Sequence, residues 1–273
     1  MADVLELFCY PVKGCAGTSV SDALLTPAGP AHDRSFMVIG EDGVHRTQRR
    51  HPRLALIRPS VSADGSRLTL DARGSTVHID VTTSAPRRDV DLFGEAFQGI
   101  DQGDEVADWL SEVLGTPSRL VRVPPEHDRI ADGWTPGPSG YADSSAVHLL
   151  TRSSLALLDQ RLPEPLPMNR FRPNIVVGGD GWAADPHAED RARRITIGGT
   201  ELGYAKLAVR CAVTLVDQET GARQGKEPLR TLAAYRRAAS GGVVFGAKFS
   251  VLRPGKLSVG DEVVVQEWGD AER

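Results

Sequence analysis

The fold class is decided by residues 54–92, LALIRPSVSADGSRLTLDARGSTVHIDVTTSAPRRDVDL. Four short apolar runs lie in it, and Gly, Asp and Pro residues separate them: 54–57, 68–70, 77–81 and 90–92. Apolar residues that alternate with polar ones are typical of strands, and turn-forming residues between such runs indicate hairpins. The segment therefore predicts short paired strands in a barrel or a sandwich.

The chain on both sides extends this pattern and then interrupts it. Residues 4–9 and 35–39 predict two further strands upstream. Residues 103–114 instead carry apolar side chains at helical spacing and are followed by Gly115, which predicts a surface helix that closes the first unit. Residues 124–140 are rich in Pro, Gly and Asp, which indicates a loop or linker near a domain boundary.

The second half returns to strands after a short helix. Thr151 is a candidate N-cap for a helix that contains Leu155, Leu158 and Leu162 and stops at Pro163. Residues 228–236 predict another helix, which starts with Pro in its first turn. Further strands are expected at 172–177, 194–197, 212–216, 243–249 and 262–265. We therefore expect a mostly β (α+β) protein in which two β units and a few helices pack together.

Composition limits the function classes. The 273 residues are 40% hydrophobic and 25% charged, which is ordinary for a globular protein. A formal net charge of −4 argues against general nucleic-acid binding, because phosphate neutralisation needs a strongly basic face. The N-terminus lacks a secretory signal and no 18-residue apolar run occurs, so we expect a cytoplasmic protein without a membrane span.

Cysteines and histidines exclude several kinds of site. Cys9, Cys15 and Cys211 are an odd and sparse set, which indicates a reducing compartment and free thiols. They are also too few for a plant-type iron–sulfur cluster, which takes four cysteines. The seven histidines have no zinc-ligand spacing, and the chain has no phosphate-binding loop and no dinucleotide fingerprint.

Cationic side chains next to Gly or Pro in apolar surroundings are the main functional signal. A buried cation suffers a desolvation penalty unless an anion meets it, so several such residues would form an anion pocket if they converge. Internal pairing is the alternative, because 36 acidic residues accompany the 32 basic ones. Five segments share the pattern: YPVKG at 10–14, DRSF at 33–36, TQR at 47–49, RFRPN at 170–174 and VRCAVT at 209–214.

These segments carry a family resemblance. YPVKGCAG at 10–17, followed by Asp33 and Arg34, resembles the opening of the MOSC N-terminal β-barrel domain. The MOSC domain that follows it is matched by RFRPNIVV at 170–177, Arg210–Cys211, Asp217, Thr220–Gly221, Phe245–Gly246 and GKLSVGD at 255–261. The resemblance covers residues 3–266. In plan, the chain is similar to the mitochondrial amidoxime-reducing components and their bacterial counterparts. The resemblance implies an N-terminal β-barrel-like domain over 1–122, packed on a β-barrel MOSC domain over 123–267, with a tail over 268–273.

The resemblance also implies a site. Cys211 corresponds to the cysteine that ligates molybdenum in a pterin-dithiolene molybdenum cofactor, and thiolate is a suitable soft ligand. Arg210 would favour the thiolate and face the negative charge of the cofactor. Two cations of the first domain and two residues of the second would hold the cofactor at the seam between them: Lys13, Arg34, Arg172 and Asn174.

Simpler roles stay open for four of these residues. Cys211 could be a small buried apolar residue, Lys13 and Arg34 could form surface salt bridges, and Asn174 could be a turn residue after Pro173.

The chain departs from the family pattern in places that matter for cofactor affinity. Gly14 and Ala16 replace a serine and a basic residue, and Val209 replaces a small hydroxyl residue, so that hydrogen bonds to the cofactor are lost. Cys15 and Cys9 are expected in the barrel core. Arg49 and Arg50 either border the pocket or form a solvated edge.

The implied activity is the two-electron reduction of an N-hydroxylated or N-oxygenated small molecule. Because the chain ends shortly after residues 262–265, we expect a separate ferredoxin- or cytochrome-type protein with its reductase to supply the electrons. The alternative function is a sulfur carrier or a molybdenum-cofactor delivery protein that uses the Cys211 thiolate. A third is a binding module that holds no cofactor.

Overall fold

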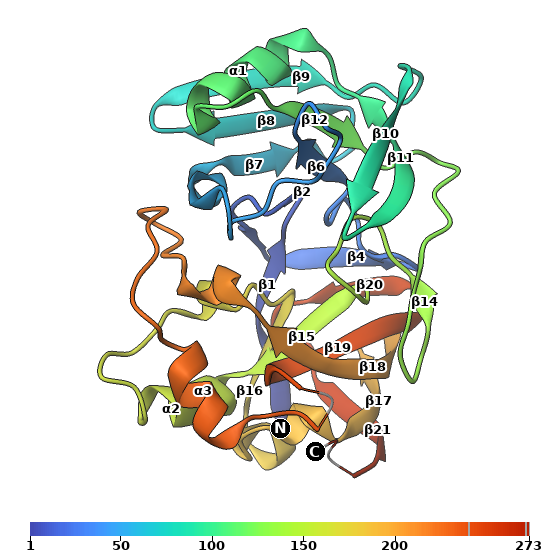
Figure 1. Ribbon diagram of the computed structural model, residues 1–273. Helices are drawn as coiled ribbons and strands as arrows, with labels where there is room; N and C mark the ends of the chain where they lie inside the picture. Colours follow the sequence, from blue (N-terminus) through green and yellow to red (C-terminus); the bar gives the residue numbers. More distant parts are fainter. Residues whose placement is uncertain (240, 271, 273) are drawn as a thin grey trace.

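The computed structural model describes residues 1–239, 241–270 and 272. Strands dominate this part of the chain, and two halves lie one above the other (Figure 1). None of its helices is long and apolar enough to cross a bilayer. The mostly β fold class predicted from the sequence is confirmed.

The upper half contains two sheets and one helix. A five-stranded sheet has the order β10-β11-β12-β6-β2, and a three-stranded sheet has the order β7-β8-β9. Their shared core includes Cys15, Leu54, Leu70 and Leu110. The elements are β2 (Val12–Lys13), β6 (Phe36–Ile39), β7 (Arg58–Val61), β8 (Arg67–Ala72), β9 (Ser75–Asp80), β10 (Arg87–Leu92), β11 (Glu95–Asp101), α1 (Asp104–Leu114) and β12 (Arg119–Arg122).

The lower half is built on an eight-stranded sheet of order β21-β17-β18-β19-β15-β16-β1-β3. Its strands are β1 (Ala2–Cys9), β3 (Thr18–Val20), β15 (Val147–Thr151), β16 (Ile175–Gly179), β17 (Ala192–Ile197), β18 (Thr200–Arg210), β19 (Val243–Arg253) and β21 (Val263–Trp268). The remaining elements of the half are α2 (Arg152–Asp159), α3 (Leu229–Tyr235), and the sheet β20 (Gly255–Ser258), β4 (Asp22–Thr26) and β5 (Gly29–Pro30). The large sheet curls until Asp3 makes an isolated bridge with Glu262, so it is barrel-like without closing.

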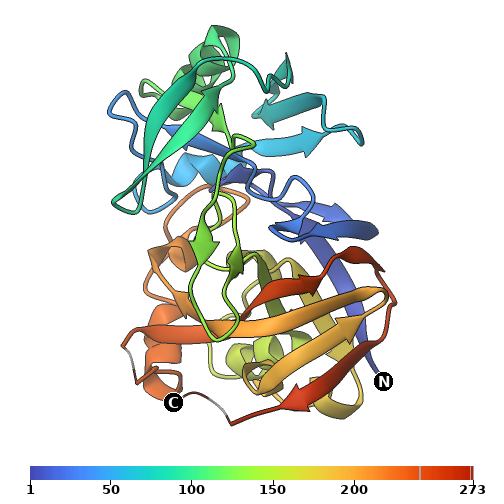
Figure 2. The ribbon, with the colours of Figure 1, turned by 90° about the vertical axis from the view of Figure 1, so that its right-hand side faces the viewer.

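The chain passes between the halves more than once. β1 pairs antiparallel with β16, so the first strand of the chain belongs to the sheet of the C-terminal half. The chain then enters the upper half and returns through residues 123–146, which descend on the right in Figure 1 and down the front of the molecule in Figure 2, and which include the small hairpin β13 (Ile130–Ala131) and β14 (Gly137–Pro138). Contacts made by β1 and by this return segment therefore hold the halves together.

Two helices form where their capping residues predict them. α1 ends at Gly115, which adopts the left-handed conformation at φ 71° and donates its N–H to Ser111 O at 2.9 Å. Thr151 caps α2, since its hydroxyl accepts a hydrogen bond from the Ser154 N–H at 3.2 Å. α2 ends at Asp159, before the predicted stop at Pro163.

Two predicted strands are wrong. Residues 54–57 lie mainly in a 3₁₀ helix, Pro52–Leu56, because Pro52 fixes φ at its first turn and Leu54 and Ala55 point into the core. Residues 212–216 lie mainly in another 3₁₀ helix, Ala212–Leu215, where the Thr214 N–H bonds to Cys211 O at 3.1 Å. Short apolar runs have no period long enough to separate strand from helix.

Candidate functional site

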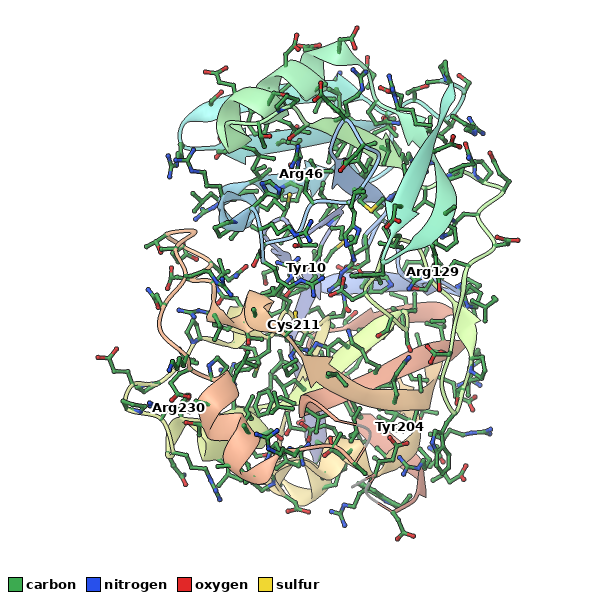
Figure 3. The ribbon with its side chains drawn as sticks, viewed as in Figure 1. Tyr10, Arg46, Arg129, Tyr204, Cys211 and Arg230 are labelled. Atoms are coloured by element: carbon green, nitrogen blue, oxygen red, sulfur yellow. The ribbon has the colours of Figure 1, made fainter. Side chains whose placement is uncertain are left out.

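A cavity of about 360 Å³ lies where the two halves meet. Side chains from both halves line it, and Figure 3 places Tyr10 and Cys211 at this junction. The predicted residues Lys13, Arg34, Arg172, Arg210 and Cys211 all line the cavity. Binding pockets commonly form between such units.

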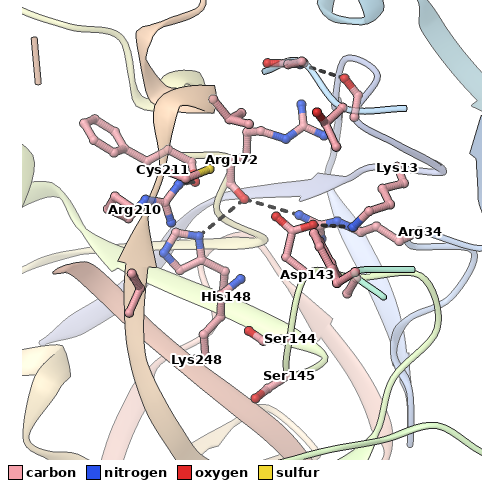
Figure 4. Close-up of a pocket in the computed structure, with 18 of the residues that line it drawn as sticks. Lys13, Arg34, Asp143, Ser144, Ser145, His148, Arg172, Arg210, Cys211 and Lys248 are labelled. Atoms are coloured by element: carbon pink, nitrogen blue, oxygen red, sulfur yellow. Dashed lines mark hydrogen bonds and ion pairs between the residues drawn. The ribbon is translucent and has the colours of Figure 1, made fainter. Parts of the chain in front are cut away.

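Cys211 reaches the cavity because the chain turns sharply after β18. β18 pairs with β19 as far as Arg210, opposite Val243. The 3₁₀ helix then begins, and Thr214 bonds to Cys211 O through both its N–H, at 3.1 Å, and its hydroxyl, at 3.0 Å. The thiol is free and half-buried, and Figure 4 shows it at the cavity beside Arg210 and Arg172.

The cavity has a large excess of positive charge. Among the described residues, eight Lys and Arg side chains line it and Asp143 is the single carboxylate. The eight are Lys13, Arg34, Arg46, Arg49, Arg172, Lys206, Arg210 and Lys248. Crowded cations in a partly buried space repel one another unless an anion enters.

Tyr10 stacks between two of these cations. The guanidinium carbons of Arg34 and Arg172 lie 4.4 and 4.3 Å from its ring centroid. The Tyr10 hydroxyl donates to Pro173 O at 3.1 Å, and the side chain is fully buried. The ring attracts both cations and spaces them apart, but it supplies no full negative charge. Asp33 pairs with Arg34, so the positive charge of Arg172 is the one that the stacked group leaves uncompensated by the described residues.

Arg34 and Arg172 also have unusual backbone conformations. Their φ angles are 46° and 54°, in the left-handed region that non-glycine residues rarely adopt. Such strain costs about 1–3 kcal/mol per residue and is concentrated at functional sites. Here it directs both guanidinium groups to the cavity.

Three of the eight cavity cations pair with a carboxylate among the described residues: Lys13 with Asp143, Arg34 with Asp33 and Lys206 with Asp132. Lys13 is 5% exposed, and its ammonium pairs with Asp143 and donates to Tyr141 O at 2.9 Å. Burial lowers the pKa of Lys13, and Asp143 opposes that shift. The Asp143 side chain is exposed, and Lys13 together with the other nearby cations holds the pKa of its carboxyl well below the usual range. Asp143 is therefore ionised in the folded protein.

Asn174 lies behind the cavity wall and does not line it. Its carbonyl accepts from Arg34 Nη1 at 3.0 Å and from the His148 N–H at 3.2 Å, and its amide donates to Asp33 Oδ1 at 3.0 Å. The side chain is almost fully buried. Asn174 positions Arg34 across the junction of the halves, which differs from the predicted direct role and from a simple turn residue.

Four buried polar atoms of cavity-lining residues have no hydrogen-bond partner among the described residues, and Arg46 Nε and Ser145 Oγ are two of them. The other two are Arg210 Nε, whose guanidinium otherwise donates through Nη2 to Phe171 O at 2.8 Å, and His148 Nε2. Burial and the repulsion from Lys248 and Arg210 hold the pKa of His148 well below its usual value, so the ring is neutral. A bound anion could accept the Arg210 N–H.

Lys248 is a cavity residue that sequence reasoning missed. It stands opposite His148 on one side and Lys206 on the other in adjacent strands. Burial, followed by repulsion from Arg34 and Arg210, lowers its pKa to about 7. No described residue forms an ion pair with it, whereas Lys206 pairs with Asp132. The sequence did contain a signal for this residue, because Lys248 interrupts the apolar pattern of the predicted strand 243–249.

The remaining residues singled out in the sequence lie at the edge of the cavity or away from it. Gly14 lines it with φ at 80°, so a side chain would be strained there. Arg49 borders the cavity, whereas Arg50 is exposed and does not. Cys15 is buried in the upper core as predicted, but Cys9 is only half-buried on β1 and lies outside that core.

The cavity suits an anionic cofactor of the kind implied by the sequence. It combines a free thiol, the guanidinium groups of Arg172 and Arg210, which form no ion pair with any described residue, and the unpaired Arg210 Nε–H. A phosphorylated pterin needs cationic donors, and a metal bound through sulfur accepts a further thiolate.

Comparison with known proteins identifies the family. The MOSC N-terminal beta barrel domain matches residues 1–117, and the MOSC domain matches residues 136–264. Mitochondrial amidoxime-reducing component 1 of Homo sapiens is 35% identical over 95% of this chain and 82% of its own length, and component 2 of Rattus norvegicus has the same figures. Molybdenum cofactor sulfurase of Danio rerio is 35% identical over 88% of this chain, which is 31% of that protein. The chain therefore belongs to the MOSC-domain family that includes the mitochondrial amidoxime-reducing components.

Proposed function

We propose that this protein is a molybdenum-cofactor-dependent reductase of N-hydroxylated or N-oxygenated small molecules. The observation that carries the proposal is the cavity itself, where eight cations face one carboxylate beside the Cys211 thiol. The family relationship to the amidoxime-reducing components supports the same activity. A reducing, cytoplasmic setting belongs to the proposal, since the three cysteines are free thiols.

Each residue has a distinct task in this proposal. Cys211 Sγ ligates the metal, while Arg34 and Arg172, fixed against Tyr10, hold the anionic part of the cofactor. Lys13 and Arg210 add charge-assisted hydrogen bonds, and Asn174 positions Arg34. When bound, the cofactor supplies two-electron removal of oxygen from nitrogen.

The overall reaction consumes two electrons and two protons. An N-hydroxylated substrate, R–NHOH, becomes R–NH₂ and water. Lys248 Nζ lies on the cavity wall and its pKa is about 7, so it can hold and release one of these protons near neutral pH.

The electrons come from a separate protein in this proposal. The three described cysteines are free thiols, fewer than the four that a plant-type iron–sulfur cluster takes, and no cluster of metal-binding side chains was found among the described residues.

The test uses molybdenum-loaded protein, benzamidoxime as substrate and three electron sources. We expect no turnover with reduced nicotinamide nucleotide alone. Turnover is expected with reduced viologen dye, and with a ferredoxin or cytochrome together with its reductase. A loaded protein that leaves benzamidoxime intact with the dye would refute the reductase, and turnover with nicotinamide alone would refute the need for a partner.

The second candidate function is a sulfur carrier or a cofactor-delivery protein. The observation in its favour is the 35% identity to a protein named molybdenum cofactor sulfurase. In that case the half-buried Cys211 thiol would carry the sulfur. Transfer of labelled sulfur or of pterin from this chain to a second protein, without any amidoxime reduction, would favour this function over the reductase.

A further inference from the structure

Two neighbouring segments at one edge of the cavity carry an excess of positive charge. Residues 46–58 and 217–230 together contain eight Lys and Arg residues and three carboxylates. The remainder of the chain contains 33 acidic and 24 basic residues. The charge of the protein is thus strongly uneven, although its formal net charge is only −4.

Contacts hold the two segments together. The side-chain amides of Gln48 and Gln218 exchange two hydrogen bonds, of 3.1 and 2.9 Å. Arg58 pairs with Glu219 at 3.1 Å, and the backbone of Gly221 packs against the Leu56 side chain. The segments come from different halves and touch each other, and Thr47, Gln48 and Arg49 of the first segment line the cavity.

The acidic residues of these segments are already neutralised. Asp217 pairs with the buried Arg170, Glu219 with Arg58, and Glu227 with Arg230. Five exposed cations remain that form no ion pair with any described residue. We call them the basic rim: Arg49, Arg50, Arg53, Arg223 and Lys226.

We propose that the basic rim docks the electron donor, and that this donor is an acidic redox protein. The inference rests on the proposed reductase function, since only a reductase needs a donor at this cavity. Charge complementarity of this kind speeds association and sets orientation. The rim attracts an acidic surface while the acidic remainder of the chain repels it, so the donor meets the protein at the cavity edge.

An acidic protein fits the rim better than an anionic membrane. Arg49 is both a rim residue and a cavity-lining residue, so a partner on the rim reaches the cavity. Electron transfer requires that proximity, because its rate falls steeply with distance. A membrane surface has no need of a position next to Cys211.

The experiment compares two double charge reversals. Arg50→Glu with Arg223→Glu alters one rim cation from each segment, and neither side chain lines the cavity. Arg253→Glu with Lys256→Glu is the control for the same charge reversal away from the cavity, and it also breaks the exposed ion pairs with Glu201 and Asp22. Arg253 lies opposite Glu201 at the far end of the β18–β19 pair from Arg210, and both control side chains are more than half exposed.

The readouts are steady-state reduction of benzamidoxime by an acidic [2Fe–2S] ferredoxin with its reductase, and by reduced viologen dye. The rim variant should lose roughly tenfold or more in kcat/KM for ferredoxin at low ionic strength. Its dye-driven rate should stay at the wild-type level. The control variant should change less than about twofold in either assay. At about 0.5 M salt, where the Debye length is only a few ångströms, the rim variant and the wild type should converge.

Several results would overturn the docking proposal while leaving the reductase intact. One is an unchanged ferredoxin rate in the rim variant together with normal dye-driven turnover. Another is binding to vesicles of anionic phospholipid that the rim variant loses without any change in ferredoxin kinetics, which would assign the rim to a membrane. Absence of dye-driven turnover in the wild type would instead refute the proposed function.

Discussion

At the scale of single residues, the cavity is organised by one aromatic ring. Tyr10 separates Arg34 from Arg172 and stacks on both of them. Both arginines have left-handed φ angles, and Arg34 is additionally held by Asn174. Asp33 pairs with Arg34, but Arg172 forms no ion pair with a described residue, so the stacked pair carries a net positive charge that a bound anion would neutralise.

Removal of single cavity cations should weaken cofactor binding. Lys13→Ala, Arg34→Ala and Arg172→Ala each remove a charge-assisted interaction, which is worth about 1.5–3 kcal/mol. Pterin and molybdenum content per purified chain should fall in all three. The control is Arg67→Ala, which removes an exposed cation paired with Asp80 in the upper half. Wild-type content in all three cavity variants would mean that the cofactor binds elsewhere.

Lys248 should make anion binding to the cavity dependent on pH. Because its pKa is about 7, the ammonium loses its charge as pH rises through that value, while the neighbouring arginines stay charged. Sulfate affinity of the cofactor-free protein, measured by calorimetry between pH 6 and 8.5, should therefore fall as pH rises. Lys248→Arg keeps the positive charge, so sulfate affinity should stay high across this pH range. Lys248→Met removes the charge, so sulfate affinity should stay low across the same range. An equally steep fall in Lys248→Met would assign the effect to another group.

At the scale of elements, helix α2 begins on a buried carboxyl group. Glu189 accepts hydrogen bonds from the Thr151 hydroxyl at 3.0 Å and the Ser154 hydroxyl at 2.7 Å. The side chain is fully buried beside Asp190, which pairs with Arg236. Burial, and then repulsion from Asp190, raise the pKa of Glu189 to about 7.

Stability should therefore depend on the protonation of Glu189. Between pH 4.5, its ordinary pKa, and about 7, the folded protein keeps a proton that the unfolded chain releases. This bound proton stabilises the folded state, and the stabilisation is fully present below pH 4.5. It is lost as pH rises through 7, and the free energy of unfolding falls by about 3 kcal/mol in total. The free energy of unfolding of Glu189→Gln, measured with urea at several pH values, should not show this fall. The exposed control Glu219→Gln should keep it, and an unchanged slope in Glu189→Gln would contradict the assignment.

The sequence predicted elements well where a local signal defines them. Thr151 and Gly115 mark helix ends through hydrogen bonds to their near neighbours, so their effect is visible in the chain. The 3₁₀ helix after Cys211 was missed because AVTLV has strand-like composition, and tertiary packing decided its conformation. The pairing of β1 with β16 joins residues about 170 positions apart, which no local pattern encodes.

The site was predictable only in part for the same reason. Lys13, Arg34, Arg172, Arg210 and Cys211 were found from family motifs, and they line one cavity. The roles of Tyr10, Asp143, His148 and Lys248 depend on neighbours from other elements, so they became visible only in three dimensions. Asn174 was assigned to the cavity but lies behind it.

At the scale of the whole molecule, the two halves share the site. The upper half supplies Lys13 and Arg34, the lower half supplies Arg172 and Cys211, and Gln48 bonds to Gln218 across the junction. A ligand in the cavity contacts both halves and should hold them together. The same junction brings the two segments of the basic rim side by side, next to the cavity.

The central claim is that the cavity holds molybdenum through Cys211. X-ray absorption at the molybdenum edge, on protein expressed in a host that makes the cofactor, counts the sulfur atoms around the metal. We expect one sulfur fewer in Cys211→Ala than in the wild type, together with loss of dye-driven benzamidoxime reduction. Cys9→Ala, which removes another half-buried free thiol, should match the wild type in both respects. An unchanged sulfur count and full activity in Cys211→Ala would contradict the account.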